Sequence, residues 1–248
     1  MNNIGAFFQT YKNTKATEFV LENFRKHHPN SPITLISDAG NNFTDLSNKY
    51  NCNYIHSFVN LGRQGTQNIK INSEYPIDPR LGFNKEETFI WINRFYESCK
   101  FSIKNNCDYI IMLEDDVYIT NPITNLPSGG FSCGENNDNF INPNLIEYLQ
   151  KKYDANFDVK YYSCCGGAIF NARIFVEKYY FILNFLDSEF DVLQKLDSRM
   201  GWLDFYMHII YYMLGCKFEV NSQFVETWMD VDWRLPKYSI VHQYKDLY

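Results

Sequence analysis

The chain lacks an excess of positive charge. Its 248 residues include 23 Lys and Arg against 29 Asp and Glu, for a formal net charge of -6, and its pI is near 5.4. General nucleic-acid binders usually present a basic stripe that displaces counterions from phosphates. We therefore expect no nucleic-acid partner, and any anionic ligand must be met by cations gathered locally.

Long apolar runs, a leader pattern and paired cysteine motifs are also missing. No run approaches the roughly 18 apolar residues of a membrane span, and the start, MNNIGAFFQTYKN, has no basic segment followed by a long apolar one. The seven cysteines are odd in number and form no C-x-x-C pair, which predicts reduced thiols and a cytoplasmic protein. Abundant Asn, Lys, Ile, Tyr and Phe are typical of an AT-rich genome, such as that of a large DNA virus.

No internal repeat, low-complexity linker or clean boundary divides the chain. With 45% hydrophobic residues, a chain of this length can bury one substantial core, so we predict a single domain over residues 1–248. Aromatic residues reach 18%. This excess suits stacking on flat rings or sugar faces, and core packing explains many of the same residues equally well.

The first half of the chain alternates predicted strands with predicted helices. Such alternation favours parallel pairing, right-handed crossovers and a mainly parallel α/β sheet flanked by helices. The second half is less regular, with a strand broken by Gly166 and Gly167 and two further helices. The expected strands are 3–8, 33–37, 53–59, 110–113 and 161–176, and the expected helices are 14–28, 44–51, 85–106, 179–186 and 201–215.

Three adjacent acids, Glu114, Asp115 and Asp116, directly follow the apolar run at 110–113. With 29 acids in the chain, two acids at i and i+2 arise by chance about three times, so the spacing alone decides nothing. Their place at the end of a buried strand is more informative, because ligands of open α/β sheets bind at that edge. Clustered carboxylates there favour Mg²⁺ or Mn²⁺, and the alternative is a group of solvated turn acids.

A strand that ends in Glu-Asp-Asp after several β/α units resembles the D-x-D motif of the GT-A fold glycosyltransferases, which use nucleotide sugars. The resemblance covers most of the chain and depends on the order of short motifs. It implies that Asp116 binds a metal ion that bridges the donor diphosphate, with Glu114 as a further candidate ligand. It also implies that Glu114 or Asp115 faces the ribose, although this chain has Glu where the family's first acid is usually Asp.

Other donor contacts follow from the same order of motifs. The segment after the first strand would place Thr10 and Tyr11 against the nucleobase, and Asp38 after the second strand would accept hydrogen bonds from the base edge. A turn tyrosine and an Asx turn explain these residues equally well. Arg63, in LGRQG, is a candidate phosphate or base contact.

The resemblance also draws attention to the end of the chain. A late histidine often ligates the metal in GT-A enzymes, and a nearby lysine contacts the diphosphate. In this sequence those residues would be His242 and Lys245, in VHQYK. An acidic protein that binds a diphosphate needs such cations, because its own charge otherwise repels the ligand.

The second half is expected to supply the acid–base residue and the acceptor site. Asp204 lies in the first turn of the helix predicted at 201–215, where the helix dipole favours its ionised form. Its position resembles the general base of inverting GT-A enzymes, and a helix-start acid is the alternative. Acceptor contacts are expected from Gly166, Gly167, Trp202, Trp228 and Trp233.

Together these features predict a metal-dependent, inverting glycosyltransferase that moves a sugar from a UDP-sugar to a hydroxyl of a carbohydrate or glycoprotein acceptor. Residues 1–120 would bind the donor and residues 121–248 the acceptor. A retaining mechanism stays open if Asp204 is not the base. A sugar nucleotidyltransferase is disfavoured because FQTYKNTK, after the first strand, has no glycine. A catalytically inactive nucleotide-sugar or carbohydrate-binding protein is the alternative from another class.

Overall fold

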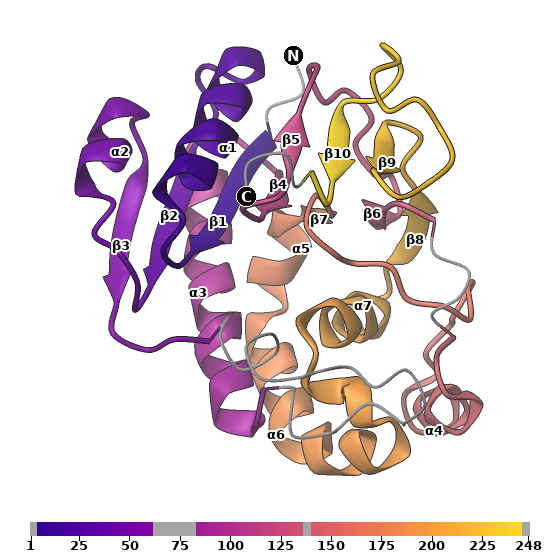
Figure 1. The fold of residues 1–248 in the computed structure, drawn as a ribbon. Coiled ribbons are helices and arrows are strands. Elements are labelled where there is room, and N and C mark those ends of the chain that lie inside the picture. Colours follow the sequence, from indigo (N-terminus) through magenta and orange to yellow (C-terminus); the bar gives the residue numbers. More distant parts are fainter. Residues whose placement is uncertain (1–3, 62–82, 136–139, 245–248) are drawn as a thin grey trace, which may run out of the picture.

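The computed structural model describes residues 4–61, 83–135 and 140–244 (Figure 1). Its centre is a seven-stranded sheet in the order β3-β2-β1-β4-β7-β6-β8. Strands β3, β2, β1 and β4 are parallel, whereas β7 runs antiparallel to both of its neighbours. The strands are β1 (Ile4–Thr10), β2 (Ile33–Asp38), β3 (Asn53–Ser57), β4 (Tyr109–Leu113), β6 (Gly130–Cys133), β7 (Ile169–Asn171) and β8 (Lys217–Val220).

Helices cover the sheet and complete the β/α units that the sequence predicts for the first half. The long helix α3 packs on the sheet through Trp91 and Phe95, whose rings meet Phe7 of β1 edge-on. The mixed, mainly parallel α/β architecture is therefore confirmed. The helices are α1 (Thr14–His27), α2 (Thr44–Lys49), α3 (Lys85–Lys104), α4 (Pro143–Tyr153), α5 (Ala172–Glu177), α6 (Tyr179–Leu196) and α7 (Leu203–Met213).

The strand expected at 161–176 is wrong for most of its length. Only Ile169–Asn171 form a strand, and the chain then enters α5 directly. The Asn171 side chain accepts a hydrogen bond from the backbone N–H of Ile174, which caps the helix. An apolar stretch with β-branched residues therefore changes from strand to helix at a single capping residue.

A second, three-stranded sheet lies beside the carboxyl end of β4 (Figure 1). It consists of β5 (Tyr118–Ile119), β10 (Ile240–His242) and β9 (Phe224–Glu226), with β10 in the middle. In the parallel register of β10 and β9, His242 pairs with Glu226. The backbone N–H of Tyr244 donates to the carbonyl of Asp116 at 2.9 Å, so the late strand is held against the acidic motif.

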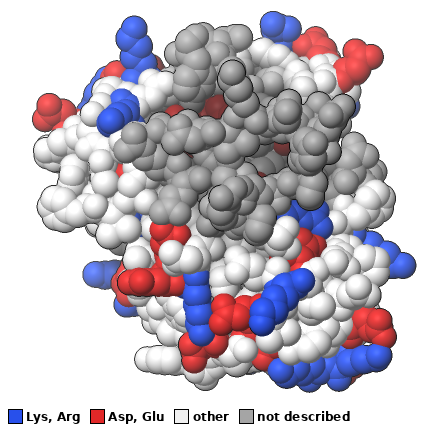
Figure 2. Space-filling model, turned by 60° about the horizontal axis from the view of Figure 1, so that its bottom comes forward, with Lys and Arg blue, Asp and Glu red and all other residues white. Residues whose placement is uncertain are grey.

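Charged side chains of both signs lie next to one another on the lower part of the face in Figure 2. Ion pairs join the helices at that end, between Lys85 and Asp187 at 2.8 Å and between Lys152 and Glu189 at 2.8 Å. Within the described residues, no helix combines the length and the apolar character needed to cross a membrane.

Candidate active site

Two carboxylates and one imidazole meet where β4 and β10 end. Glu114 and Asp116 follow β4, and His242 is the last residue of β10. His242 Nε2 lies 3.7 Å from Glu114 Oε2 and 3.6 Å from Asp116 Oδ1. One ligand atom from each residue lies within 4.8 Å of the other two. The sequence analysis had named all three as metal ligands, and the fold brings them together from distant parts of the chain.

His242 is held by Glu226, which the sequence analysis did not identify. The imidazole is 5% exposed, and its Nδ1 lies 2.9 and 3.0 Å from the two Glu226 oxygens. Burial alone would lower the pKa of His242, but the carboxylates of Glu114 and Glu226 raise that pKa well above its usual value. Glu226 thus fixes the ring so that Nε2 faces Glu114 and Asp116.

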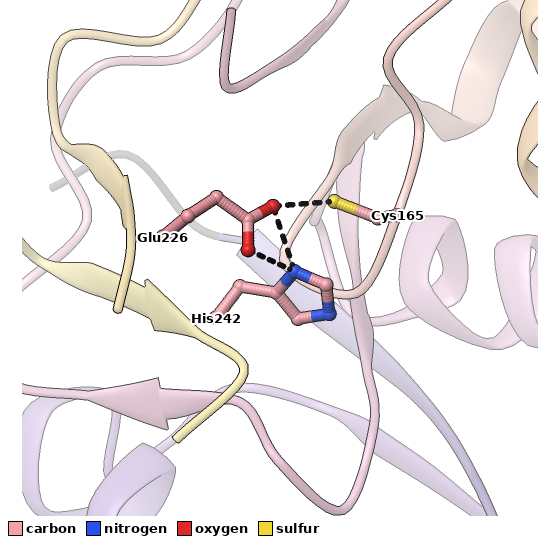
Figure 3. Close-up of side chains that lie close together, drawn as sticks. All are labelled: Cys165, Glu226 and His242. Atoms are coloured by element: carbon pink, nitrogen blue, oxygen red, sulfur yellow. Dashed lines mark hydrogen bonds and ion pairs between the residues drawn. The ribbon is translucent and has the colours of Figure 1, made fainter. Parts of the chain in front are cut away.

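The Glu226 carboxylate has two further contacts besides the one with His242. Trp228 Nε1 donates to Glu226 Oε2 at 3.2 Å, and Cys165 Sγ lies 3.6 Å from Glu226 Oε1 (Figure 3). The sequence signal for Glu226 is weak: a short apolar strand ends in an acid, as β4 does, but β9 has only three residues. Its parallel pairing with β10 is visible only in the fold.

Asp204 lies in the first turn of α7, close enough to this cluster to interact with it electrostatically. Burial, and then the negative charge of Glu114, raise the pKa of the Asp204 carboxyl well above its usual value. Three carboxylates, those of Glu114, Asp116 and Glu226, therefore lie around His242, and Asp204 interacts with this group electrostatically. Such a concentration of acid is costly without a cation, because the like charges repel one another.

The residues fit a divalent cation. Two carboxylate oxygens and an imidazole nitrogen are a common ligand set for first-row divalent metals, and they leave positions for water or phosphate oxygens. Mn²⁺ fits this ligand set better than Mg²⁺. Mg²⁺ prefers oxygen ligands alone, whereas Mn²⁺ accepts a nitrogen ligand more readily.

Two predicted base contacts differ in the structure. The Asp38 carboxylate is 2% exposed, pairs with Arg94 at 2.8 Å and accepts from the backbone N–H of Leu61. Thr10 Oγ1 lies 2.7 Å from Thr17 Oγ1, which joins β1 to α1. Both side chains therefore make internal contacts, and their contacts with a nucleobase stay a prediction. Tyr11 lies partly exposed just past β1, and Asp115 is partly exposed between the two carboxylates of the candidate site.

The two glycines of the acceptor prediction have clear packing reasons. A Cβ on Gly166 would lie 2.9 Å from Glu114 Cδ, so a glycine lets this loop approach the acidic motif. Gly167 has a φ of +91°, and a Cβ there would lie 2.6 Å from Ile240 Cγ2. Both glycines thus shape the wall between β4 and β10.

The three tryptophans differ in their surroundings. Trp228 is 61% exposed beside Glu226, and Trp202 is partly buried at the start of α7, next to Leu203 and Asp204. Trp233 packs edge-on against Tyr118 and Tyr244, with ring centroids 6.2 and 5.6 Å apart. Trp233 therefore supports the small sheet. Two further predicted donor contacts, Arg63 and Lys245, lie outside the described residues.

Comparison with known proteins places this arrangement in context. No model of a known protein family matches the chain, and no curated protein sequence matches it. The solved structure of the galactosyltransferase LgtC, in complex with donor and acceptor sugar analogs, superposes with a TM-score of 0.51 at 13% identity. The match covers 98% of this chain and 88% of that one. This chain has the GT-A fold.

Another structure with a GT-A fold, mouse xyloside xylosyltransferase 1, matches with a TM-score of 0.46 at 11% identity and covers 97% of both chains. At these identities the likeness concerns the fold. The acidic motif of this chain lies at the end of β4, where open α/β sheets bind their ligands.

Proposed function

We propose that this protein is a metal-dependent glycosyltransferase. It transfers a sugar from a nucleoside diphosphate donor, with UDP-sugars as the first candidates, to a hydroxyl group of a carbohydrate or glycoprotein acceptor. The observation that carries the proposal is the convergence of Glu114, Asp116 and His242 in a chain with the GT-A fold.

In this proposal Glu114, Asp116 and His242 hold Mn²⁺ or Mg²⁺, and Asp115 contacts the ribose. The ion would neutralise the diphosphate as it leaves the sugar. Glu226 keeps the His242 ring oriented, since its carboxylate accepts the Nδ1–H and leaves Nε2 facing the two acids.

Asp204 is proposed as the general base of an inverting displacement. It takes the proton of the acceptor hydroxyl as that oxygen attacks the anomeric carbon and the bond to the diphosphate oxygen breaks. The place of Asp204 in the first turn of α7, close enough to Glu114 and His242 to interact with them electrostatically, supports this role. If Asp204 is not the base, the retaining alternative applies.

The remaining contacts are assigned by position. Tyr11, past the end of β1, is proposed to face the nucleobase, and Arg63 and Lys245 the diphosphate. Trp228 offers an exposed ring to a sugar face beside Glu226, with Trp202, Gly166 and Gly167 on the side of α7 and β7. We also propose the division into a donor half, residues 1–120, and an acceptor half, residues 121–248, within one domain.

The deciding test compares Asp116→Asn with Asp230→Asn. Both remove one carboxylate charge, but Asp230 is exposed and is not one of the candidate metal ligands. Release of nucleoside diphosphate is measured with Mn²⁺ over a panel of sugar nucleotides and acceptors. Loss of turnover in Asp116→Asn alone is expected. Equal turnover in both variants would contradict the metal site, and donor binding without turnover in the wild type would favour a binding protein.

A further inference from the structure

The Nδ1 side of His242 faces a second set of metal-ligating atoms. Figure 3 shows Cys165, Glu226 and His242 pointing toward one another from three separate segments. Cys165 Sγ lies 3.6 Å from Glu226 Oε1, which lies 2.9 Å from His242 Nδ1. One ligand atom from each of the three residues lies within 4.8 Å of the other two. This donor set of sulfur, oxygen and nitrogen differs from the two carboxylates on the Nε2 side.

The spacing of these atoms suits a tetrahedral zinc ion. With bonds of about 2.3 Å to sulfur and about 2.0–2.2 Å to nitrogen or oxygen, neighbouring ligands of tetrahedral Zn²⁺ lie about 3.3–3.7 Å apart. The distance of 3.6 Å between sulfur and oxygen falls in that range, the 2.9 Å between oxygen and nitrogen needs a small opening, and sulfur and nitrogen lie within 4.8 Å of each other. Three protein ligands leave the fourth position for water, as in other open zinc sites.

We propose that Cys165, Glu226 and His242 form a Zn²⁺ site. Zn²⁺ bound there inhibits sugar transfer, because His242 is then no longer a ligand of the cation held by Glu114 and Asp116. A thiolate ligand selects borderline or soft ions such as Zn²⁺ over Mg²⁺ and Mn²⁺. The two groups of ligands therefore prefer different metals, although they share one imidazole.

The shared imidazole makes the two sites exclusive. A neutral imidazole has one nitrogen with a free lone pair and one that carries the proton. When Nδ1 binds Zn²⁺, the Nδ1 proton is released to solvent and the remaining ring proton sits on Nε2, which then presents N–H to Glu114 and Asp116 and is no longer a ligand. Binding also releases the Cys165 thiol proton to solvent, since a coordinating thiol is deprotonated. This inhibitory consequence rests on the proposed function, whereas the zinc site itself does not.

Access to the site is possible from the Cys165 and Glu226 side. Both residues are partly exposed, whereas His242 is buried. Cys133 Sγ lies 3.5 Å from Cys165 Sγ but is fully buried. Because two thiols this close can be oxidised to a disulfide, the experiment is done in a non-thiol reductant.

The test uses Co²⁺ as a spectroscopic probe for Zn²⁺ in the full chain. A bond between cobalt and thiolate gives a charge-transfer absorption in the near ultraviolet, which carboxylate and imidazole ligands do not give. We expect this band in the wild type, its loss on addition of Zn²⁺, and its absence in Cys165→Ser. Cys52→Ser is the matched control, because Cys52 is also partly exposed but lies between α2 and β3, the edge strand that two strands separate from β4.

In Cys165→Ser we expect Zn²⁺ affinity to fall by more than roughly 10–100-fold. A loss of that size follows removal of a residue that only orients a metal ligand, whereas Cys165 is proposed to bind the metal itself. A wild type without the band, or a band that survives in Cys165→Ser, would overturn the site. Cys165→Ala provides a second variant if serine in this position impairs folding, which circular dichroism checks. The band must also be absent in Cys165→Ala.

A second arm measures sugar transfer at fixed Mn²⁺ while Zn²⁺ is added. In the wild type Zn²⁺ should raise the Mn²⁺ concentration needed for half-maximal rate, and Cys165→Ser should lose that effect. A band without any transferase activity would support the zinc site and count against the proposed function. Transferase activity without a band would support the proposed function and count against the zinc site.

Discussion

At the scale of single residues, His242 gains its role from Glu226. The Glu226 oxygens lie 2.9 and 3.0 Å from Nδ1, so the ring cannot turn away from Glu114 and Asp116 without breaking that contact. Partners of this kind fix both the orientation and the tautomer of a ligating histidine. Glu226 would therefore influence a bound metal ion indirectly, by orienting His242.

We predict that Glu226→Gln lowers Mn²⁺ affinity by about 10–100-fold, because glutamine keeps the shape but loses the charge that stabilises the Nδ1–H. Affinity is measured by titrating Mn²⁺ in the transfer assay and by calorimetry. Glu219→Gln is the control, since Glu219 lies on β8 and bonds to Ser128. A wild-type Mn²⁺ requirement in Glu226→Gln would show that Glu226 does not position His242.

For Asp204→Asn we predict a fall in kcat of about 10²–10⁴-fold with little change in KM for the donor, as expected when a general base is removed. The limb of the pH–rate profile that reports the base should also disappear. Asp191→Asn, at an exposed position of α6, serves as the control. An unchanged profile, or a product that retains the anomeric configuration, would contradict the assignment.

The sequence was informative about residues that sit at the ends of strong elements. Glu114 and Asp116 follow a fully apolar strand, and His242 closes a short one. Glu226 was missed because β9 is too short to show a pattern. The ion pair of Asp38 with Arg94 was not predicted, because an acid at a strand end looks the same whether its partner is a ligand or an arginine 56 residues later.

At the scale of elements, the loop before β7 sets the distance between the two sheets. Gly167 has a positive φ, a Cβ added there would lie 2.6 Å from Ile240 Cγ2 in β10, and its N–H donates to the carbonyl of Met112 in β4. This residue therefore lies between β10, which ends in His242, and β4, which Glu114 and Asp116 follow.

We predict that Gly167→Ala destabilises the protein by clearly more than Gly215→Ala. Both glycines have positive φ, which costs an L-residue about 1–2 kcal/mol. A Cβ at Gly167 would lie 2.6 Å from Ile240 Cγ2, whereas a Cβ at Gly215 meets no atom within 4 Å. Urea denaturation gives both free energies of unfolding. Equal losses of unfolding free energy would mean that Ile240 moves away from the added Cβ at little cost.

Element boundaries were predicted best where helical periodicity is long. The expected helix at 85–106 is α3, which begins with a capping box between Asn84 and Glu87. The expected strand at 161–176 failed because its residues suit either state, and the cap at Asn171 decides between them. The small sheet could not be foreseen, since its strands have only two or three residues each and β5 lies far in the sequence from β9 and β10.

At the scale of the whole molecule, the candidate metal site joins the middle of the chain to its last described strand. β10 lies between β5 and β9, and Tyr244 bonds to the backbone of Asp116. A cation bound by Asp116 and His242 would therefore bind the folded state alone, because the unfolded chain holds these ligands far apart.

We predict that Mn²⁺ raises the melting temperature of the wild type without any nucleotide sugar. At a concentration about 100 times the dissociation constant, the expected gain is about 2.7 kcal/mol. Asp230→Asn should keep this gain and Asp116→Asn should lose it. An equal shift in both variants would mean that Mn²⁺ stabilises the protein at another place.

The late position of β10 in the sequence also determines when the candidate metal site can form during synthesis. Glu114 and Asp116 leave the ribosome long before His242 does, and β5 has no neighbour in its sheet until β10 is made. A growing chain can thus complete the parallel strands β1 to β4 early while the candidate metal site is still unfinished. Under the proposed function, activity is expected only after β10 has been inserted, so the protein stays inactive while it is being made.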